Sequence, residues 1–387
     1  MKTIQITIGT IITIITLFVV FYQQANATFD TTPEVPIGIE NDDEVAIQIA
    51  ILLDNSGSMS GLIEQTKSQL WKIVNELSDL EHKGQTPMLN IGLYTHGDTN
   101  IKQISAFTGD LDKISQDLFS LGINGGSEYC GAAIKKSIKE LEWNNNPNSL
   151  KMIYIAGNES FAQGHIPYRD AIAQAREKGV VVNTIFCGPA KTGIQLEWGE
   201  GARLGDGDYT NIDHNQETVY INTPYDDEIS KFNTKLNDTY VGYGADREVR
   251  MGHFDQQDSN ASSYGTGNMA ERAVFKTKKS YDNSSWDLVD AYKKDKNVVN
   301  KQLEVASELQ GKSAEEMEAY VKEKLEKRTE IQEKIQELSK KRKAFIADQR
   351  KSSSSEASFE QSILNSVNKQ ASKKGYERQD DSKKKVN

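Results

Sequence analysis

One carboxylate and two hydroxyls stand at alternate positions in the segment that contains Asp54, Ser56 and Ser58. The apolar run 45–53 directly before them is typical of a parallel strand buried on both faces. Because α/β folds bind ligands at the carboxyl ends of such strands, these oxygens are placed to hold a hard dication such as Mg²⁺ or Mn²⁺. The alternative is that Asp54 and Ser58 only cap the next helix, as Asp and Ser commonly do.

The elements around this segment predict an α/β domain over residues 45–222. Gly57 allows a tight turn, and apolar residues at helical spacing predict a helix over 61–80. Apolar strand-like runs then alternate with helical patterns, which predicts a doubly wound, mostly parallel, Rossmann-like sheet of six or so strands. The further strands are expected at 89–95, 152–156, 180–186 and 208–212, and the further helices at 110–121, 131–141 and 168–178.

The C-terminal part of the chain is expected to be mainly α-helical. Residues 223–284 predict a short helix followed by an irregular connector, because 242–268 are rich in Gly, Ser, Asp and Asn. Residues 285–350 predict a helical region with one long charged helix, and 351–387 a linker, a short helix and a disordered charged tail. Apolar residues of the long helix keep near-heptad spacing, interrupted by Arg328 and Arg342. A coiled coil and a helix packed on its own domain are both open.

The N-terminus indicates export. Residues 1–27 predict a signal peptide that ends in an Ala25-Asn26-Ala27 cleavage pattern, and 28–44 a linker. If cleavage does not occur, the apolar stretch 4–21 is long enough to anchor the protein in a membrane. A periplasmic or secreted location follows. The net charge of −10 argues against nucleic acid as a partner.

The Asp-x-Ser-x-Ser pattern at a strand end resembles the von Willebrand factor A domain (VWA) family, whose metal-ion-dependent adhesion site (MIDAS) begins with it. The resemblance implies two further ligands, a Thr in a loop before a helix and an Asp at the end of a later strand. The chain departs at both places: Ser127 or Glu128 stands in the Thr position, and Gly157 in the Asp position. Ser127 is favoured as the hydroxyl ligand, and Glu128 or Glu159 is expected to supply the missing negative charge.

The resemblance therefore implies a modified site of Asp54, Ser56, Ser58 and Ser127, with a glutamate added. Mg²⁺ or Mn²⁺ is expected and Ca²⁺ is compatible, but Gly157 cannot coordinate, so cation binding is expected to be weak or lost unless a glutamate compensates. Cys130 and Cys187 are expected near the same edge of the sheet, which predicts a disulfide, with two buried free thiols as the alternative.

Further sequence segments resemble exported bacterial VWA proteins with a helical C-terminus. That resemblance implies fold and site rather than activity. A partially coordinated cation can accept a carboxylate, which favours a binding module that engages an acidic group on a protein partner through the metal site. The main alternative is a metal-free structural protein that acts, or self-associates, through its C-terminal helices. A metal-dependent hydrolase is the weaker alternative, because no catalytic constellation of nucleophile and base is evident in the sequence.

Overall fold

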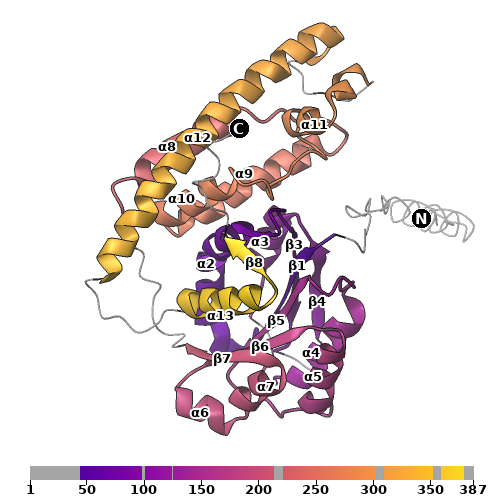
Figure 1. Ribbon diagram of the computed structural model, residues 1–387, viewed down its shortest axis with the longest axis vertical. Coiled ribbons are helices and arrows are strands. Elements are labelled where there is room, and N and C mark those ends of the chain that lie inside the picture. The colour runs from indigo at the N-terminus through magenta and orange to yellow at the C-terminus, as the bar shows by residue number, and fades with distance from the viewer. Residues whose placement is uncertain are drawn as a thin grey trace, which may run out of the picture. The chain divides into compact units, whose positions relative to one another are not determined.

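A computed structural model describes residues 44–97, 101–123, 125–212, 221–301, 305, 309–351 and 359–378, all within one compact unit. Their main feature is a six-stranded sheet in the order β4-β3-β1-β5-β6-β7 (Figure 1). Only β4 pairs antiparallel to its neighbour, so the predicted doubly wound, mostly parallel sheet is confirmed. The strands are β1 (Ala46–Leu53), β3 (Met88–Thr95), β4 (Lys102–Thr108), β5 (Leu150–Gly157), β6 (Val181–Cys187) and β7 (Asp206–Ile212).

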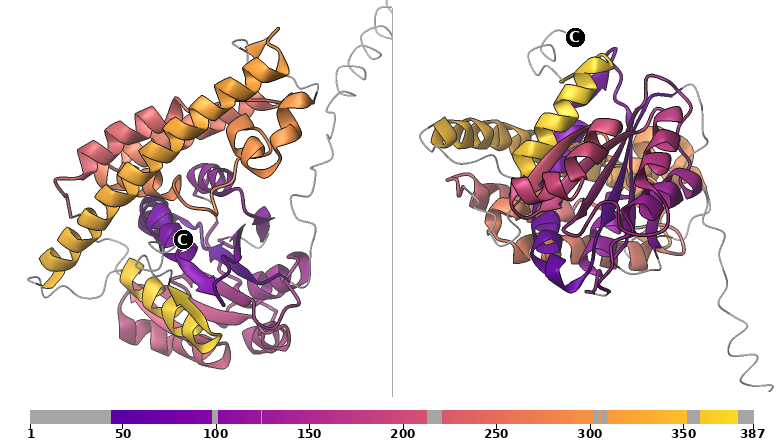
Figure 2. Two further views of the ribbon diagram at one scale, coloured as in Figure 1. Left: turned by 45° about the horizontal axis from the view of Figure 1, so that its top comes forward. Right: turned by 90° about the horizontal axis from the view of Figure 1, so that it is seen from below.

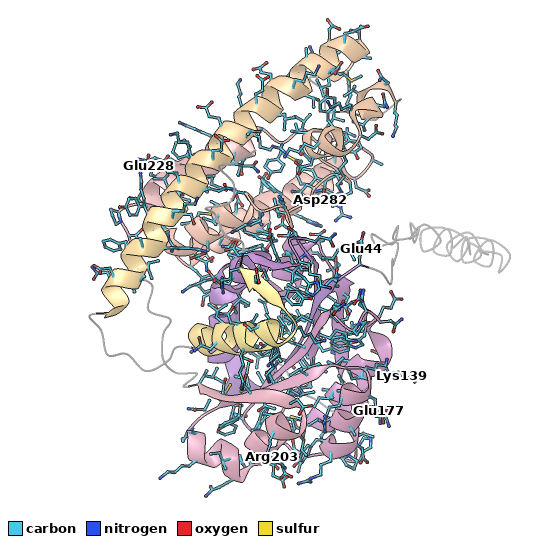
Figure 3. All side chains as sticks on the ribbon, viewed as in Figure 1. Glu44, Lys139, Glu177, Arg203, Glu228 and Asp282 are labelled. Carbon is cyan, nitrogen blue, oxygen red and sulfur yellow. The ribbon has the colours of Figure 1, made fainter. Side chains whose placement is uncertain are left out.

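Helices cover both faces of this sheet (Figure 2). One apolar core lies between the sheet and α2 (Ser60–Ser78), α3 (Leu111–Phe119) and α13 (Phe359–Lys373). A second core lies under α4 (Cys130–Glu140), α5 (Tyr168–Glu177) and α7 (Trp198–Leu204), with the short α6 (Ala190–Gln195) beside α7. Charged side chains such as Lys139 on α4 and Glu177 on α5 point away from the sheet (Figure 3).

The sheet domain is completed by residues that come after the helical region. Ile363, Val367 and Ala371 of α13 are buried in the first core, together with Tyr376. Tyr376 belongs to β8 (Tyr376–Arg378), which pairs antiparallel with β2 (Leu80–His82). The charged tail expected from residue 373 onward is therefore ordered through Arg378, because Tyr376 provides an apolar anchor within it.

The helical region between β7 and α13 consists of α8 (Asp226–Asn237), α9 (Arg247–Ser263), α10 (Thr266–Phe275), α11 (Leu288–Lys294), η2 (Lys296–Asn300) and α12 (Ala314–Lys351). The irregular connector expected at 242–268 is wrong, since most of it is α9 and the start of α10. All residues of α10 after Thr266 are buried. Most helical stability in proteins comes from tertiary packing, and here that packing outweighs a composition that is typical of a loop.

The long helix α12 packs on α8, α10 and α11 of its own chain. The two arginines that interrupt its apolar stripe are both buried. Arg328 pairs with Asp287 and Asp290, and Arg342 pairs with Asp226. The interruptions in the heptad pattern are thus sites of internal ion pairing, which accords with the packed-helix alternative; self-association stays a prediction.

Several predictions fall outside the described residues. They are the signal peptide, the possible anchor at 4–21, nearly all of the linker 28–44, and the tail beyond Arg378. Within the ranges given above, no helix combines the length and apolar character that a bilayer crossing requires.

Candidate metal site

The loop between β1 and α2 gathers the oxygens of the Asp-x-Ser-x-Ser pattern. Asp54 is fully buried, and its backbone N–H donates to the Ala156 carbonyl at 3.0 Å, which fixes it against the end of β5. Ser56 donates to the Asp54 carboxylate from its backbone N–H at 2.8 Å and from Oγ at 2.7 Å. Ser58 Oγ lies 3.0 Å from Ser56 Oγ and donates to Asn158 Oδ1 at 3.3 Å. The cluster is continuous from the buried carboxylate to the surface.

The capping alternative finds no support in this geometry. Between the strand and α2 lies one short turn, η1 (Gly57–Met59). The N-cap residues of η1 and α2 are Ser56 and Met59, and neither makes a side-chain capping bond. The Ser56 hydroxyl is directed to Asp54 instead.

A second carboxylate, that of Glu128, reaches this cluster from the loop before α4. It is fully buried and accepts the backbone N–H of Asn158 at 3.0 and 3.1 Å, and that of Glu159 at 3.0 Å. Its own backbone N–H donates to Gln163 Oε1 at 2.6 Å. Burial, reinforced by the neighbouring Asp54 carboxylate, raises the pKa of Glu128 to about 9. Without a cation, the Glu128 carboxyl group is therefore expected to be protonated near neutral pH.

The Glu128 carboxylate occupies the space in front of Gly157. A Cβ atom at Gly157 would lie 2.1 Å from Glu128 Oε2 and 3.0 Å from the ring of Trp198. No side chain fits at position 157 while Glu128 keeps this conformation. The loop residue Glu128 thus brings a carboxylate to the place where an aspartate at position 157 would have its side chain.

The other two candidate ligands are placed less directly. Ser127 is half-buried on the same loop as Glu128. Glu159 has an exposed side chain, and it joins the site through its backbone, donating its N–H to Glu128 and accepting the Trp198 indole N–H on its carbonyl at 2.7 Å. Of the two glutamates considered from the sequence, only Glu128 brings its carboxylate to Asp54.

His96 and Gly97, which follow β3, lie next to Asp54. His96 is fully buried, and burial lowers its pKa against the opposing effect of the Asp54 charge. From the sequence, His96 is expected in a surface loop, with a place at the rim of the site as the alternative, and its burial contradicts the surface loop; Gly97 was not identified. The signal available was a glycine directly after a strand that neighbours β1.

We expect Gly97→Ala to damage the site and to cost about 1–3 kcal/mol of unfolding free energy, as overpacking does. The reason is that a Cβ at this position would lie 2.6 Å from both Asp54 Oδ1 and the Ser56 backbone nitrogen. Gly122→Ala is the matched control, because a Cβ there meets nothing within 4 Å. Chemical denaturation of the two variants tests this, and equal stability would contradict it.

The donor set fits a hard dication. Two buried carboxylates in contact repel each other unless a proton or a cation lies between them, and within the described ranges no Lys or Arg pairs with either. The adjacent Ser and Asn oxygens are ligands that Mg²⁺ and Mn²⁺ accept. No group of three or more His, Cys, Asp and Glu side chains suited to a metal occurs among the described residues. The candidate site therefore depends on hydroxyl and amide oxygens as well as carboxylates.

Cys130 and Cys187 are both free and buried, so the predicted disulfide is not formed in this structure. Cys187 belongs to the core under α2 and α3, whereas Cys130 belongs to the core under α4 and α5. Burial raises the pKa of both thiols, and the nearby Asp54 and Glu128 carboxyl groups add to that effect. The buried-thiol alternative describes this arrangement.

Residues 48–197 match the family of the von Willebrand factor type A domain. With the mostly parallel sheet described above, this segment of the chain is a VWA domain. The matched range contains the whole candidate site, from Asp54 to Glu159. A search among curated proteins finds no match.

Solved structures that match the chain include several with VWA folds. Proximal thread matrix protein 1 from the mussel byssus is 14% identical over 45% of this chain and 43% of its own, with a TM-score of 0.34. The SpRpn10 VWA domain is 19% identical over 46% of this chain and 100% of its own, with a TM-score of 0.33. An aerotolerance-related membrane protein from Bacteroides fragilis is 16% identical over 43% and 92%, with a TM-score of 0.32.

The chain thus spans less than two thirds of the length of the byssal protein. Another structure of that byssal protein is described as having a zinc-occupied MIDAS motif.

Proposed function

We propose that this protein is a cation-dependent binding module that engages an acidic group on a protein partner. The observation that supports this best is the position of Glu128, whose carboxylate lies beside Asp54 in the space that a side chain at Gly157 would fill. The departure at Gly157 therefore does not remove the second carboxyl group from the site. We therefore expect the site to bind a cation although Gly157 replaces the expected aspartate.

In this proposal Asp54 and Glu128 provide charge, and Ser56, Ser58 and Ser127 provide neutral oxygens. The Ser58 end of the cluster is exposed, so a partner can reach it, while the carboxylates at the base are shielded from water. A bound Mg²⁺ or Mn²⁺ would supply an electrophilic position for a partner carboxylate. Ca²⁺ is also compatible with an all-oxygen donor set.

The location that we propose is outside the cytoplasm. This rests on the cleavage pattern and the apolar segment of residues 1–27, with retention as a membrane anchor as the alternative. Self-association through the C-terminal helices remains a separate proposal that rests on the near-heptad spacing of α12.

A metal-free structural role is the second candidate, and one observation favours it. Because the pKa of Glu128 is raised to about 9, this carboxyl group can be uncharged near neutral pH, and the site then needs no cation to balance a second negative charge. Hydrolase activity is the third candidate and would need Glu128 or Glu159 as general base next to a metal-bound water.

Capture of protein partners from an extracytoplasmic fraction tests the proposal. Immobilised protein is compared with an Asp54→Ala variant, each in Mg²⁺ and in chelator. Capture that requires both Mg²⁺ and Asp54 would support the binding module. Capture that persists in chelator and in the variant would favour the metal-free role, and turnover of ester or phosphoester substrates would favour the hydrolase.

A further inference from the structure

Two neighbouring residues of α10 connect to two different helices of the VWA domain. Glu271 contacts α2, where Asn75 Nδ2 donates to its backbone carbonyl at 2.9 Å and to its carboxylate at 2.8 Å. Arg272 contacts α3, where its guanidinium pairs with Asp112. Adjacent residues of one helix of the helical region thereby contact both α2 and α3, among other contacts between them.

This link is buried and has several partners, which makes it rigid. Arg272 has no exposed surface, and its guanidinium lies 4.4 Å from the ring centroid of Trp71 on α2. Asp112 also accepts a hydrogen bond from the Tyr281 hydroxyl at 2.7 Å. A buried charge pair of this kind is costly to break from one side, because the remaining charge stays without compensation.

Both helices are connected in sequence to the loops of the candidate metal site. The loop that carries Asp54, Ser56 and Ser58 precedes α2, and the loop that carries Glu128 follows α3. The two loops also touch each other, since Asn55 Nδ2 donates to the Gly122 carbonyl at 3.0 Å. The relative position of α2 and α3 is therefore one determinant of how the loop after α3 lies against the loop that carries Asp54.

We propose that the helical region is a clamp that preorganises the metal site, and that Asp112, Asn75 and Arg272 are positioning residues for cation binding. The inference rests on the proposed function, because it concerns the affinity of that same site. Ligand groups held in place by supporting contacts lose less freedom on binding, so a loosened clamp weakens affinity. A partner that displaces the helical region would, by linkage, lower cation affinity.

The test compares two Asp→Asn variants of the full chain by Mn²⁺ titration calorimetry. Asp112→Asn loosens the link from α10 to α3. Asp290→Asn is the matched control: both carboxylates pair with a buried arginine and are 8% and 9% exposed, but Asp290 pairs with Arg328 inside the helical region. We expect Asp112→Asn to weaken Mn²⁺ binding about fivefold or more, and Asp290→Asn to leave it unchanged.

The outcomes separate this inference from the proposed function. If the unaltered protein does not bind Mn²⁺, the proposed function fails. If it binds, and both variants keep its affinity or lose it equally, the clamp fails. Should Asp112→Asn not fold, Tyr281→Phe replaces it: this variant removes the hydrogen bonds of the Tyr281 hydroxyl with Asp112 and Arg272, and Mn²⁺ affinity equal to that of the unaltered protein would contradict the clamp. In the unaltered protein, Mn²⁺ should also slow hydrogen exchange in α10, and unchanged exchange would contradict the clamp.

Discussion

A chain that ends at Lys351 is expected not to fold its VWA domain, even though the residues that match the family end at 197. Such a chain lacks α13 and β8, which bury Ile363, Leu364, Val367 and Tyr376 against the domain. Burial of a large apolar side chain contributes about 1.5–3 kcal/mol, so the four together amount to about 6–12 kcal/mol. That is as large as the whole stability of an ordinary domain, about 5–15 kcal/mol.

Polar contacts add specificity to this interface. Ser366 Oγ and Gln370 Nε2 of α13 donate to Asn183 Oδ1 on β6, at 2.9 and 2.7 Å. The Tyr376 hydroxyl accepts the Leu150 backbone N–H at 3.1 Å at the start of β5. The C-terminal segment thus contacts β5, which is next to the central strand β1, and β6, which is next to β5.

Two adjacent residues of β8 give a point test of the same interface. Tyr376 is buried and Glu377 is exposed. Tyr376→Ala is expected to cost about 3–5 kcal/mol, and Glu377→Ala about 0.5 kcal/mol or less. Denaturant unfolding measures both. Cooperative unfolding of the truncated chain with undiminished stability would contradict this account of the domain.

The second large effect is expected when the strand-end carboxylate is restored at position 157. Gly157→Asp alone forces a side chain onto the Glu128 carboxylate and places a third acidic group beside Asp54. We expect Gly157→Asp to lower the free energy of unfolding by at least about 3 kcal/mol. Gly126→Asp on the loop before α4 is the control, because a Cβ at Gly126 meets nothing within 4 Å.

The double variant Glu128→Ser, Gly157→Asp should recover part of that loss. Removal of the glutamate frees the space that the aspartate needs, so the two substitutions are expected to couple favourably by about 2 kcal/mol. A double-mutant cycle measured by denaturant unfolding gives the coupling. If the effects of the two substitutions on the unfolding free energy simply add, the carboxylates of Glu128 and of an aspartate at position 157 do not compete for one space, and this explanation is wrong.

Much of the sheet could be predicted from sequence because its central strands are buried on both faces. Uninterrupted apolar runs such as 45–53 have that property. The edge strand β4 was missed, since Lys102 and Gln103 at its start are exposed and its pairing with β3 is irregular. The role of α13 in the VWA core was also missed, because its contacts join residues far apart in the chain, as between Ser366 and Asn183.

Part of the site could be predicted from the sequence, and part could not. Asp54, Ser56 and Ser58 lie within one short segment, so their proximity follows from local sequence. The choice between Glu128 and Glu159 could not be made from spacing, because it depends on which carboxylate enters the space left by Gly157. Gly97 was missed for the same reason: its importance lies in its close approach to Asp54 across two neighbouring strands.

The most direct test of the central claim is the effect of Mn²⁺ on the unfolding free energy of three proteins: the unaltered chain, Glu128→Gln and Glu159→Gln. Binding to the folded state alone stabilises by about 2.7 kcal/mol at a hundredfold excess of cation over Kd. We expect this gain in the unaltered chain and in Glu159→Gln, and its loss in Glu128→Gln. A gain that survives Glu128→Gln but disappears in Glu159→Gln, or no gain in any of the three, would contradict the account.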